Sequence, residues 1–169
     1  MNRKLAYILI ATMSLMILAG IALSLVNYYT NKGKAMEDTE TTITIGDNTS
    51  YNREFNLGKL NPGDSVEYTI RLNAKNKSSV YVVSVNYEEI ADHGLKHLVD
   101  VRLTVDGNVV FEGKLADLLK PETSFSLECE PSEEDSVVLH AVYYMSDAIG
   151  NEAMGTSADF GLNITSKAK

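Results

Sequence analysis

The sequence predicts an all-β fold: a β-sandwich of the jelly-roll or Greek-key type with one short helix, preceded by an N-terminal hydrophobic helix. Two observations indicate it. Residues 39–164 hold about eight or nine short segments of alternating apolar and polar residues, separated by turn signals. Residues 5–26 carry no charge and follow Arg3 and Lys4. We therefore expect three parts: a signal peptide or membrane anchor in 1–30, a linker in 31–38 and a sandwich domain in 39–169.

The N-terminal apolar segment favours export. A run of this length can span a bilayer, which makes it long for the apolar part of a signal peptide. Small residues nevertheless allow cleavage after Ala22 or Ser24. Arg3 and Lys4 place the amino end in the cytoplasm. Cleaved or retained, the segment carries the domain outside the cell, to the medium or the cell surface; a buried core helix is the remaining alternative.

The first two strands are expected on either side of a turn at Asp47 and Asn48. Residues 39–46 alternate, with Ile43 and Ile45 on one face. Residues 51–57 form a second short strand whose inward side chains are Phe55 and Leu57.

The next two strands are expected to pair as the centre of an antiparallel sheet. Residues 61–64, Asn-Pro-Gly-Asp, are typical of a type II turn. Residues 65–74 then alternate, with an apolar face formed by Val66, Tyr68, Ile70 and Leu72. Residues 79–87 are rich in valine and tyrosine and predict a more deeply buried strand. Residues 88–96 are expected to form a loop.

The remaining elements follow from turn chemistry and periodicity. Asp106-Gly107 predicts a type I′ hairpin between strands at 98–106 and 109–111. Leucines at helical spacing in 114–119, followed by Pro121, predict one or two turns of helix. Three further strands are expected at 124–130, 137–145 and 158–164, separated by an acidic turn at 130–135 and a polar loop at 147–155.

Composition limits the possible partners. The chain carries 15 basic and 23 acidic residues, a net charge of −8, and 13 against 23, or −10, without Arg3 and Lys4. Such an acidic chain would repel the phosphates of nucleic acid. The single cysteine, Cys129, excludes an internal disulfide and is expected to be a half-buried strand residue.

Two sets of side chains are considered as metal ligands. His93 and His97 stand four residues apart, as in a zinc-binding helix, but Gly94 occupies the position of the glutamate base; Glu88, Glu89 or Asp92 would have to supply a third ligand. Asp147, Asn151, Glu152 and Asp159 offer oxygen ligands for calcium without the ordering of a calcium loop. We expect solvated loops at both places, no catalytic residue, no cofactor and no bound metal, and we expect His140 to be a core histidine.

Four stretches together resemble the TasA/camelysin family of exported matrix-fibre proteins. They are residues 25–30 (LVNYYT), 42–46 (TITIG), 57–65 (LGKLNPGDS) and 147–160 (DAIGNEAMGTSADF). Ala153 and Met154 depart from the Tyr-Gln pair usual in the family. The resemblance implies a jelly-roll subunit that polymerises outside the cell by donating a strand to the next subunit.

The resemblance makes three residues candidates for strand exchange: Thr41, Ile43 and Ile45. Their expected partners are further copies of the chain or related matrix subunits, joined by β-augmentation. Ile43 and Ile45 packing inside their own sandwich is the alternative. Two other functions remain open: a membrane-anchored, monomeric surface binding module held by residues 5–26, and a secreted zinc metallopeptidase, an activity attached to camelysin members of the family.

Overall fold

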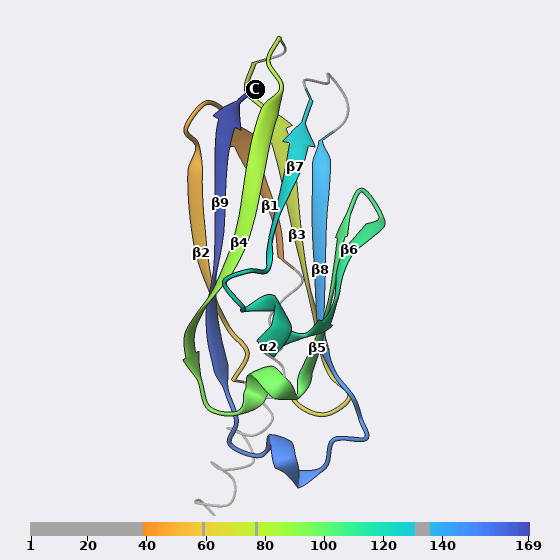
Figure 1. The fold of residues 1–169 in the computed structure, drawn as a ribbon. Coiled ribbons are helices and arrows are strands. Elements are labelled where there is room, and N and C mark those ends of the chain that lie inside the picture. The colour runs from red at the N-terminus through yellow and green to blue at the C-terminus, as the bar shows by residue number, and fades with distance from the viewer. Residues whose placement is uncertain (1–38, 59, 77, 131–135) are drawn as a thin grey trace, which may run out of the picture. The chain divides into compact units, whose positions relative to one another are not determined.

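Two β-sheets packed face to face make up the part of the chain that the computed structural model describes, residues 39–58, 60–76, 78–130 and 136–169 (Figure 1). The predicted all-β class is confirmed. The strands are β1 (Thr39–Ile45), β2 (Ser50–Asn56), β3 (Ser65–Ala74), β4 (Tyr81–Asp92), β5 (Val99–Val105), β6 (Asn108–Lys114), β7 (Ser124–Cys129), β8 (Val137–Met145) and β9 (Ala158–Ala168). The helical elements are the 3-10 turns η1 (Leu95–His97) and η2 (Asn151–Ala153) and the short helix α2 (Leu115–Leu118).

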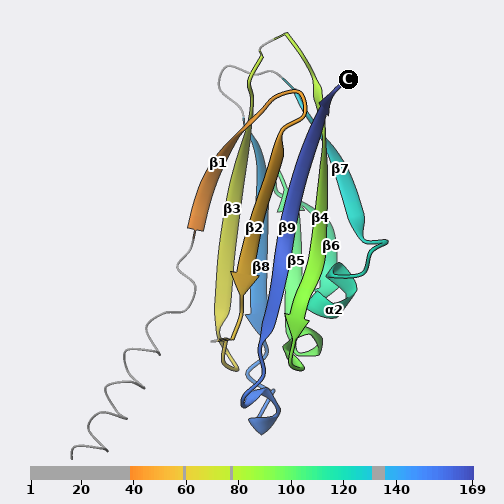
Figure 2. The same ribbon diagram turned by 90° about the vertical axis from the view of Figure 1, so that its left-hand side faces the viewer.

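The strands follow a crossed order in both sheets. The five-stranded sheet runs β1-β3-β8-β5-β6 and the four-stranded sheet runs β2-β9-β4-β7. Within the described strands every pairing is antiparallel except that of β1 with β3, which is parallel. Figure 2 shows β1 at the outer edge of its sheet, beside β3.

Alternating side chains from both sheets meet in one core. In β3, for example, Val66, Tyr68, Ile70 and Leu72 are all buried, as their spacing predicts. An aromatic cluster joins the two sheets within this core: the ring centroids of Phe55 and Phe160 lie 5.2 Å apart, and those of Phe55 and Tyr68 4.9 Å apart. Offset and edge-to-face contacts of this kind add to the stabilisation from buried area.

The expected pairing of the third and fourth strands is wrong. β3 pairs with β1 and β8, whereas β4 pairs with β7 and β9, so the two strands lie in different sheets. The connection between them crosses from one sheet to the other. The alternation of apolar and polar residues determines which side chains point to the core. It does not determine whether the next strand in the chain joins the same sheet or the other sheet.

The expected loop at 88–96 is also wrong over most of its length. β4 continues to Asp92, with a bulge between Glu89 and Ala91 opposite β9. Its end carries exposed side chains at Glu88, Glu89 and Ile90. Backbone pairing with β9 maintains the strand here without apolar alternation, which explains why periodicity missed it.

The predicted turns at 61–64 and 106–107 and the predicted short helix are confirmed. Asp106 (φ 48°) and Gly107 (φ 80°) both have the left-handed backbone that a type I′ turn requires. Gly63 has φ 85°, and the Asp64 amide donates to the carbonyl of Asn61 at 2.9 Å, as expected for the type II turn. The helix α2 buries Leu115, Leu118 and Leu119 and packs against β5, β6 and η1.

Candidate functional site

The strand β1 lies at one edge of the five-stranded sheet. It has one strand neighbour, β3, and its register places Ile43 beside Leu72 and Ile45 beside Ala74. As an edge strand it leaves one row of backbone hydrogen-bonding groups outside the ladder, and parallel pairing is slightly less stable per residue than antiparallel pairing. Departure of β1 would convert β3 into the new edge.

Two isoleucines anchor β1 in the core. Ile43 retains 7% of its exposure and Ile45 none, whereas Thr42 and Thr44 point outward and are exposed. Thr41, the third candidate of the sequence analysis, is half-buried at the rim between the sheets. Without a partner, the three candidates thus pack within their own sandwich, which was the alternative weighed from the sequence.

A polar cluster of β2 and β3 side chains contacts Thr41 on the inner side of β1. The Nη1 atom of Arg53 in β2 donates to Thr41 Oγ1 and to the hydroxyl of Tyr68, each at 3.2 Å. Tyr51 and Tyr68 share a hydrogen bond of 3.1 Å between their hydroxyls. The guanidinium also lies 4.7 Å from the ring centroid of Tyr68 and 5.5 Å from that of Phe55. We call Tyr51, Arg53 and Tyr68 the rim cluster.

A second contact holds β1 on the outer face of the sheet, where Glu40 forms an ion pair with Arg71 of β3. Both side chains are about half exposed, so the pair contributes little to stability but favours the observed register.

A tight connection joins β1 to β2 across the two sheets. The Gly46 amide donates to Thr49 Oγ1 at 2.8 Å, and the Gly46 carbonyl accepts from Ser166 Oγ at 2.6 Å. Asn48 adopts a left-handed backbone, with φ 57°. Four residues, 46–49, therefore join β1 of one sheet to β2 of the other.

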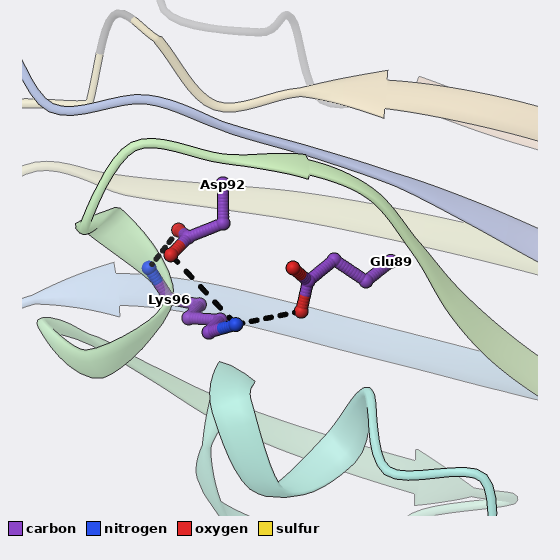
Figure 3. A network of polar contacts seen from close by, with 3 residues as sticks. All are labelled: Glu89, Asp92 and Lys96. Atoms are coloured by element: carbon purple, nitrogen blue, oxygen red, sulfur yellow. Dashed lines mark hydrogen bonds and ion pairs between the residues drawn. The ribbon is translucent and has the colours of Figure 1, made fainter.

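The histidines considered as zinc ligands do not share a helix. Gly94 (φ 92°) separates His93 from the 3-10 turn η1, which contains His97, and both imidazoles are exposed. Lys96 pairs with the neighbouring carboxylates: its Nζ lies 2.7 Å from the carboxylate of Glu89 and 3.8 Å from that of Asp92 (Figure 3). The backbone amide of Lys96 also donates a hydrogen bond to Asp92. This network ties η1 to the end of β4, and the pairing with Glu89 raises the pKa of Lys96.

The oxygen-rich loop is likewise open to solvent. Asp147, Asn151 and Glu152 are exposed, and Asp159 lies in β9, where its carboxylate accepts from the Asn56 side-chain amide. No group of three His, Cys, Asp or Glu side chains in the described ranges is arranged to hold a metal ion.

His140 is not a core histidine. Its side chain points outward from β8 with 33% exposure and lies 3.3 Å from Glu67 of β3. The apolar strand around it misled the interpretation, because outward positions of β8 also carry valines. Cys129 is more buried than expected, at 1% exposure, and burial raises the pKa of its thiol, which donates to the Leu72 carbonyl at 3.6 Å.

The predicted cleavage positions Ala22 and Ser24 and the apolar segment 5–26 lie outside the described residues, as do 131–135 of the acidic turn. Within the part of the chain that the structure does describe, no helix is long and apolar enough to cross a bilayer.

Sequence reasoning missed the rim cluster. The available signal was Tyr51 and Arg53 on the inward face of 51–57, alternating with Phe55. A charged residue on an inward face points to a specific partner, which here is supplied by two other strands.

No protein-family model and no curated protein sequence matches the chain. Solved structures similar to it include a periplasmic inhibitor of g-type lysozyme, PliG from Aeromonas hydrophila, with 11% identity over 77% of this chain and 99% of the inhibitor and a TM-score of 0.36. Another is the sugar-binding C-terminal domain of EclA, with 18% identity, 80% and 88% coverage and a TM-score of 0.37. A third is the insecticidal δ-endotoxin Cry8Ea1 from Bacillus thuringiensis, with 18% identity over 73% of this chain and 20% of the toxin and a TM-score of 0.28. Similarity at this level carries no argument about function.

Proposed function

We propose that the protein is an exported structural subunit of an extracellular matrix or cell-surface fibre that assembles head-to-tail by β-strand addition. In this assembly the β1 strand of one copy leaves its own domain and occupies the β1 position beside β3 of the next. The single observation that carries the proposal is β1 itself: an edge strand, alone in its parallel pairing among the described strands, anchored by Ile43 and Ile45.

The energetics of β1 are compatible with exchange. Burial of two isoleucines contributes about 3–6 kcal/mol. Ordering the backbone of its seven residues costs about 7–14 kcal/mol, so the ladder hydrogen bonds and rim contacts must supply the difference. The same contacts re-form in a second copy, so exchange loses little of the stabilisation.

The connection at 46–49 supports an open assembly. Short hinges favour domain swapping, because a chain that cannot relax within one molecule relaxes by reaching another. Donor and acceptor surfaces lie on different parts of each subunit, so the contact is heterologous and can continue indefinitely.

The proposed fold type is a jelly roll, as the TasA/camelysin resemblance implies. The order β2-β9-β4-β7 facing β3-β8-β5-β6 supports it, because eight strands wound as two Greek keys across two sheets form such a fold. The edge strand β1 is then an addition to the eight-stranded core. Export outside the cell follows from the apolar segment 5–26, which either is cleaved or retains the subunit at the membrane.

Filament growth tests the function. We expect a protein comprising residues 31–169, which includes the whole compact unit Ala35–Lys169, to form filaments in electron micrographs as its concentration rises. The double variant Ile43→Asp, Ile45→Asp should abolish them, because two carboxylates cannot enter the apolar sites beneath β1. Sedimentation measures the polymer fraction, and the far-UV circular dichroism spectrum should still report folded β-sheet.

The matched control is Thr42→Asp, Thr44→Asp, which adds the same charge to the exposed face of the same strand. It should still form filaments. A chain that is monomeric at every concentration, with an exported form that retains Met1, would instead favour the membrane-anchored binding module.

A further inference from the structure

Arg53 carries a charge without a carboxylate partner in the described structure. The other described basic side chains outside ion pairs, Lys75, Arg102 and Lys167, are exposed, whereas Arg53 is half-buried under β1. Its Nη1 contacts only hydroxyls, those of Thr41 and Tyr68, and its plane lies against two aromatic rings. This guanidinium therefore has hydrogen-bonding capacity that β1 fills only with a neutral oxygen.

The surroundings of Arg53 favour an anionic acceptor. Burial raises the pKa of the Tyr68 phenol, so Tyr68 stays neutral and supplies no negative charge. The 3.2 Å distance from Nη1 to Thr41 Oγ1 is long for a hydrogen bond from a cation, for which about 2.7–2.9 Å is usual with a carboxylate. A carboxylate oxygen at this position lies one bond further from the backbone and approaches the guanidinium more closely.

We infer that the rim cluster selects the strand that occupies the β1 site by its residue at position 41, and that it prefers a carboxylate there. The ligand class is an extended segment with an acidic residue two positions before the first of two alternating β-branched apolar residues. The occupant would be a strand of another chain with this pattern, which displaces the chain's own β1. Displacement of β1 by another chain rests on the proposed strand exchange. The preference of Arg53 for a carboxylate at position 41 does not depend on that exchange.

The pattern also defines the register. A strand shifted by two residues toward its amino end would place Ile43 against Arg53 and Asp47 in the buried site of Ile45. A shift in the other direction would place Thr41 in the site of Ile43. Each alternative buries a polar group without a partner or removes the acceptor from Arg53.

The first test measures local opening of β1 in the full chain in detergent micelles, by hydrogen–deuterium exchange of residues 39–45. Thr41→Asp should slow this exchange about tenfold relative to its neutral isostere Thr41→Asn, since aspartate adds an ion pair to a hydrogen bond that asparagine accepts only through a neutral oxygen; tenfold corresponds to about 1.4 kcal/mol. The difference should disappear in the Arg53→Met background, while protection of β3 and β8 shows that the sandwich remains folded. An equal rate for Asp and Asn, or a gain that survives Arg53→Met, would overturn the inference.

The second test uses labelled peptides of residues 39–46 added to the full chain, with fluorescence anisotropy as the readout. The Thr41→Asp peptide should bind about tenfold more tightly than the Thr41→Asn peptide, and only with Arg53 present. Equal binding of the two contradicts the proposed ligand class. If neither peptide binds and no filament forms, strand exchange fails, whereas the exchange rates of the first test still decide the preference of Arg53.

Discussion

At the scale of single residues, burial has assigned different roles to chemically similar side chains. Tyr68 reaches the rim, where its hydroxyl bonds Arg53 and Tyr51. Tyr87 and Tyr143 are buried in the core, and their phenolic oxygens have no hydrogen-bond partner of normal geometry among the described atoms. Burial raises the pKa of both phenols, so they remain neutral. The hydroxyl of Tyr68 thus contributes to the polar contacts beneath β1. The rings of Tyr87 and Tyr143 pack in the core, where burying their hydroxyls costs desolvation free energy.

The unpartnered core hydroxyls lead to a stability prediction. Tyr143→Phe removes a buried oxygen that lacks a partner and retains the ring that lies 5.4 Å from Phe160. We expect the free energy of unfolding to be unchanged or to rise by about 1 kcal/mol, because desolvation of an unpaired hydroxyl is no longer required. Urea denaturation measures it.

The control is Tyr68→Phe, which removes a hydroxyl that is bonded and should reduce stability by about 1 kcal/mol. A loss of similar size for Tyr143→Phe would mean that its oxygen has a partner, such as the nearby hydroxyl of Tyr87 or an ordered water molecule.

At the scale of elements, the tight turns depend on local residue chemistry, whereas the ends of the strands depend on the strands they pair with. The Asp106-Gly107 hairpin joins β5 to β6 as its dipeptide predicts. In contrast, β4 and β9 extend past their apolar segments because each provides a backbone ladder for the other. Local signals are therefore sufficient for a tight turn, whereas strand ends depend on a partner distant in sequence.

The hairpin gives an element-scale prediction. Gly107→Ala should lower the free energy of unfolding by about 1 kcal/mol, since alanine disfavours the left-handed backbone at φ 80° although no neighbouring atom lies within 4 Å of its methyl position. Chemical denaturation of the two proteins measures the difference.

Gly107→Asn is its matched control, because asparagine tolerates the left-handed backbone better than alanine does. It should lower the free energy of unfolding less than Gly107→Ala does. Equal effects of the two substitutions would show that backbone conformation is not the cause.

At the scale of the whole molecule, the arrangement of strands places the only described parallel pairing at one edge. Without β1 both sheets would still be continuous, whereas loss of β8 or β9 would divide a sheet. The proposed polymer uses this difference: each subunit keeps a closed core and exchanges one peripheral strand.

Cross-linking between two chains tests this directly. In a Cys129→Ser background, one chain carries Thr44→Cys and the other Asn73→Cys, positions that are paired between β1 and β3 and exposed. If β1 exchanges, mixing and oxidation should give a disulfide between the two chains, because adjacent strands bring the Cα atoms within bridging distance. Electrophoresis without reductant measures it.

The control pairs Thr42→Cys with Asn73→Cys, two residues out of register. It should give far less of the mixed disulfide. Equal yields would indicate random collision and would contradict the proposed exchange.

The sequence alone determined the local features of this protein. Period-two alternation located the strands and their inward residues, and glycine and proline located the turns, because both depend only on neighbours within a few residues. It also identified Thr41, Ile43 and Ile45 as one strand near the amino end of the domain.

Only the tertiary structure decided which strands pair and what lies beneath β1. Strands β3 and β4 would show the same alternation in one sheet as they do in two different sheets, and His140 and Arg53 acquire their surroundings from other strands. The physical reason is that a side chain's burial and charge partners depend on contacts between sheets, which local sequence does not encode. The rim cluster, formed by residues of β2 and β3 around a third strand, exists only once the two sheets are packed together.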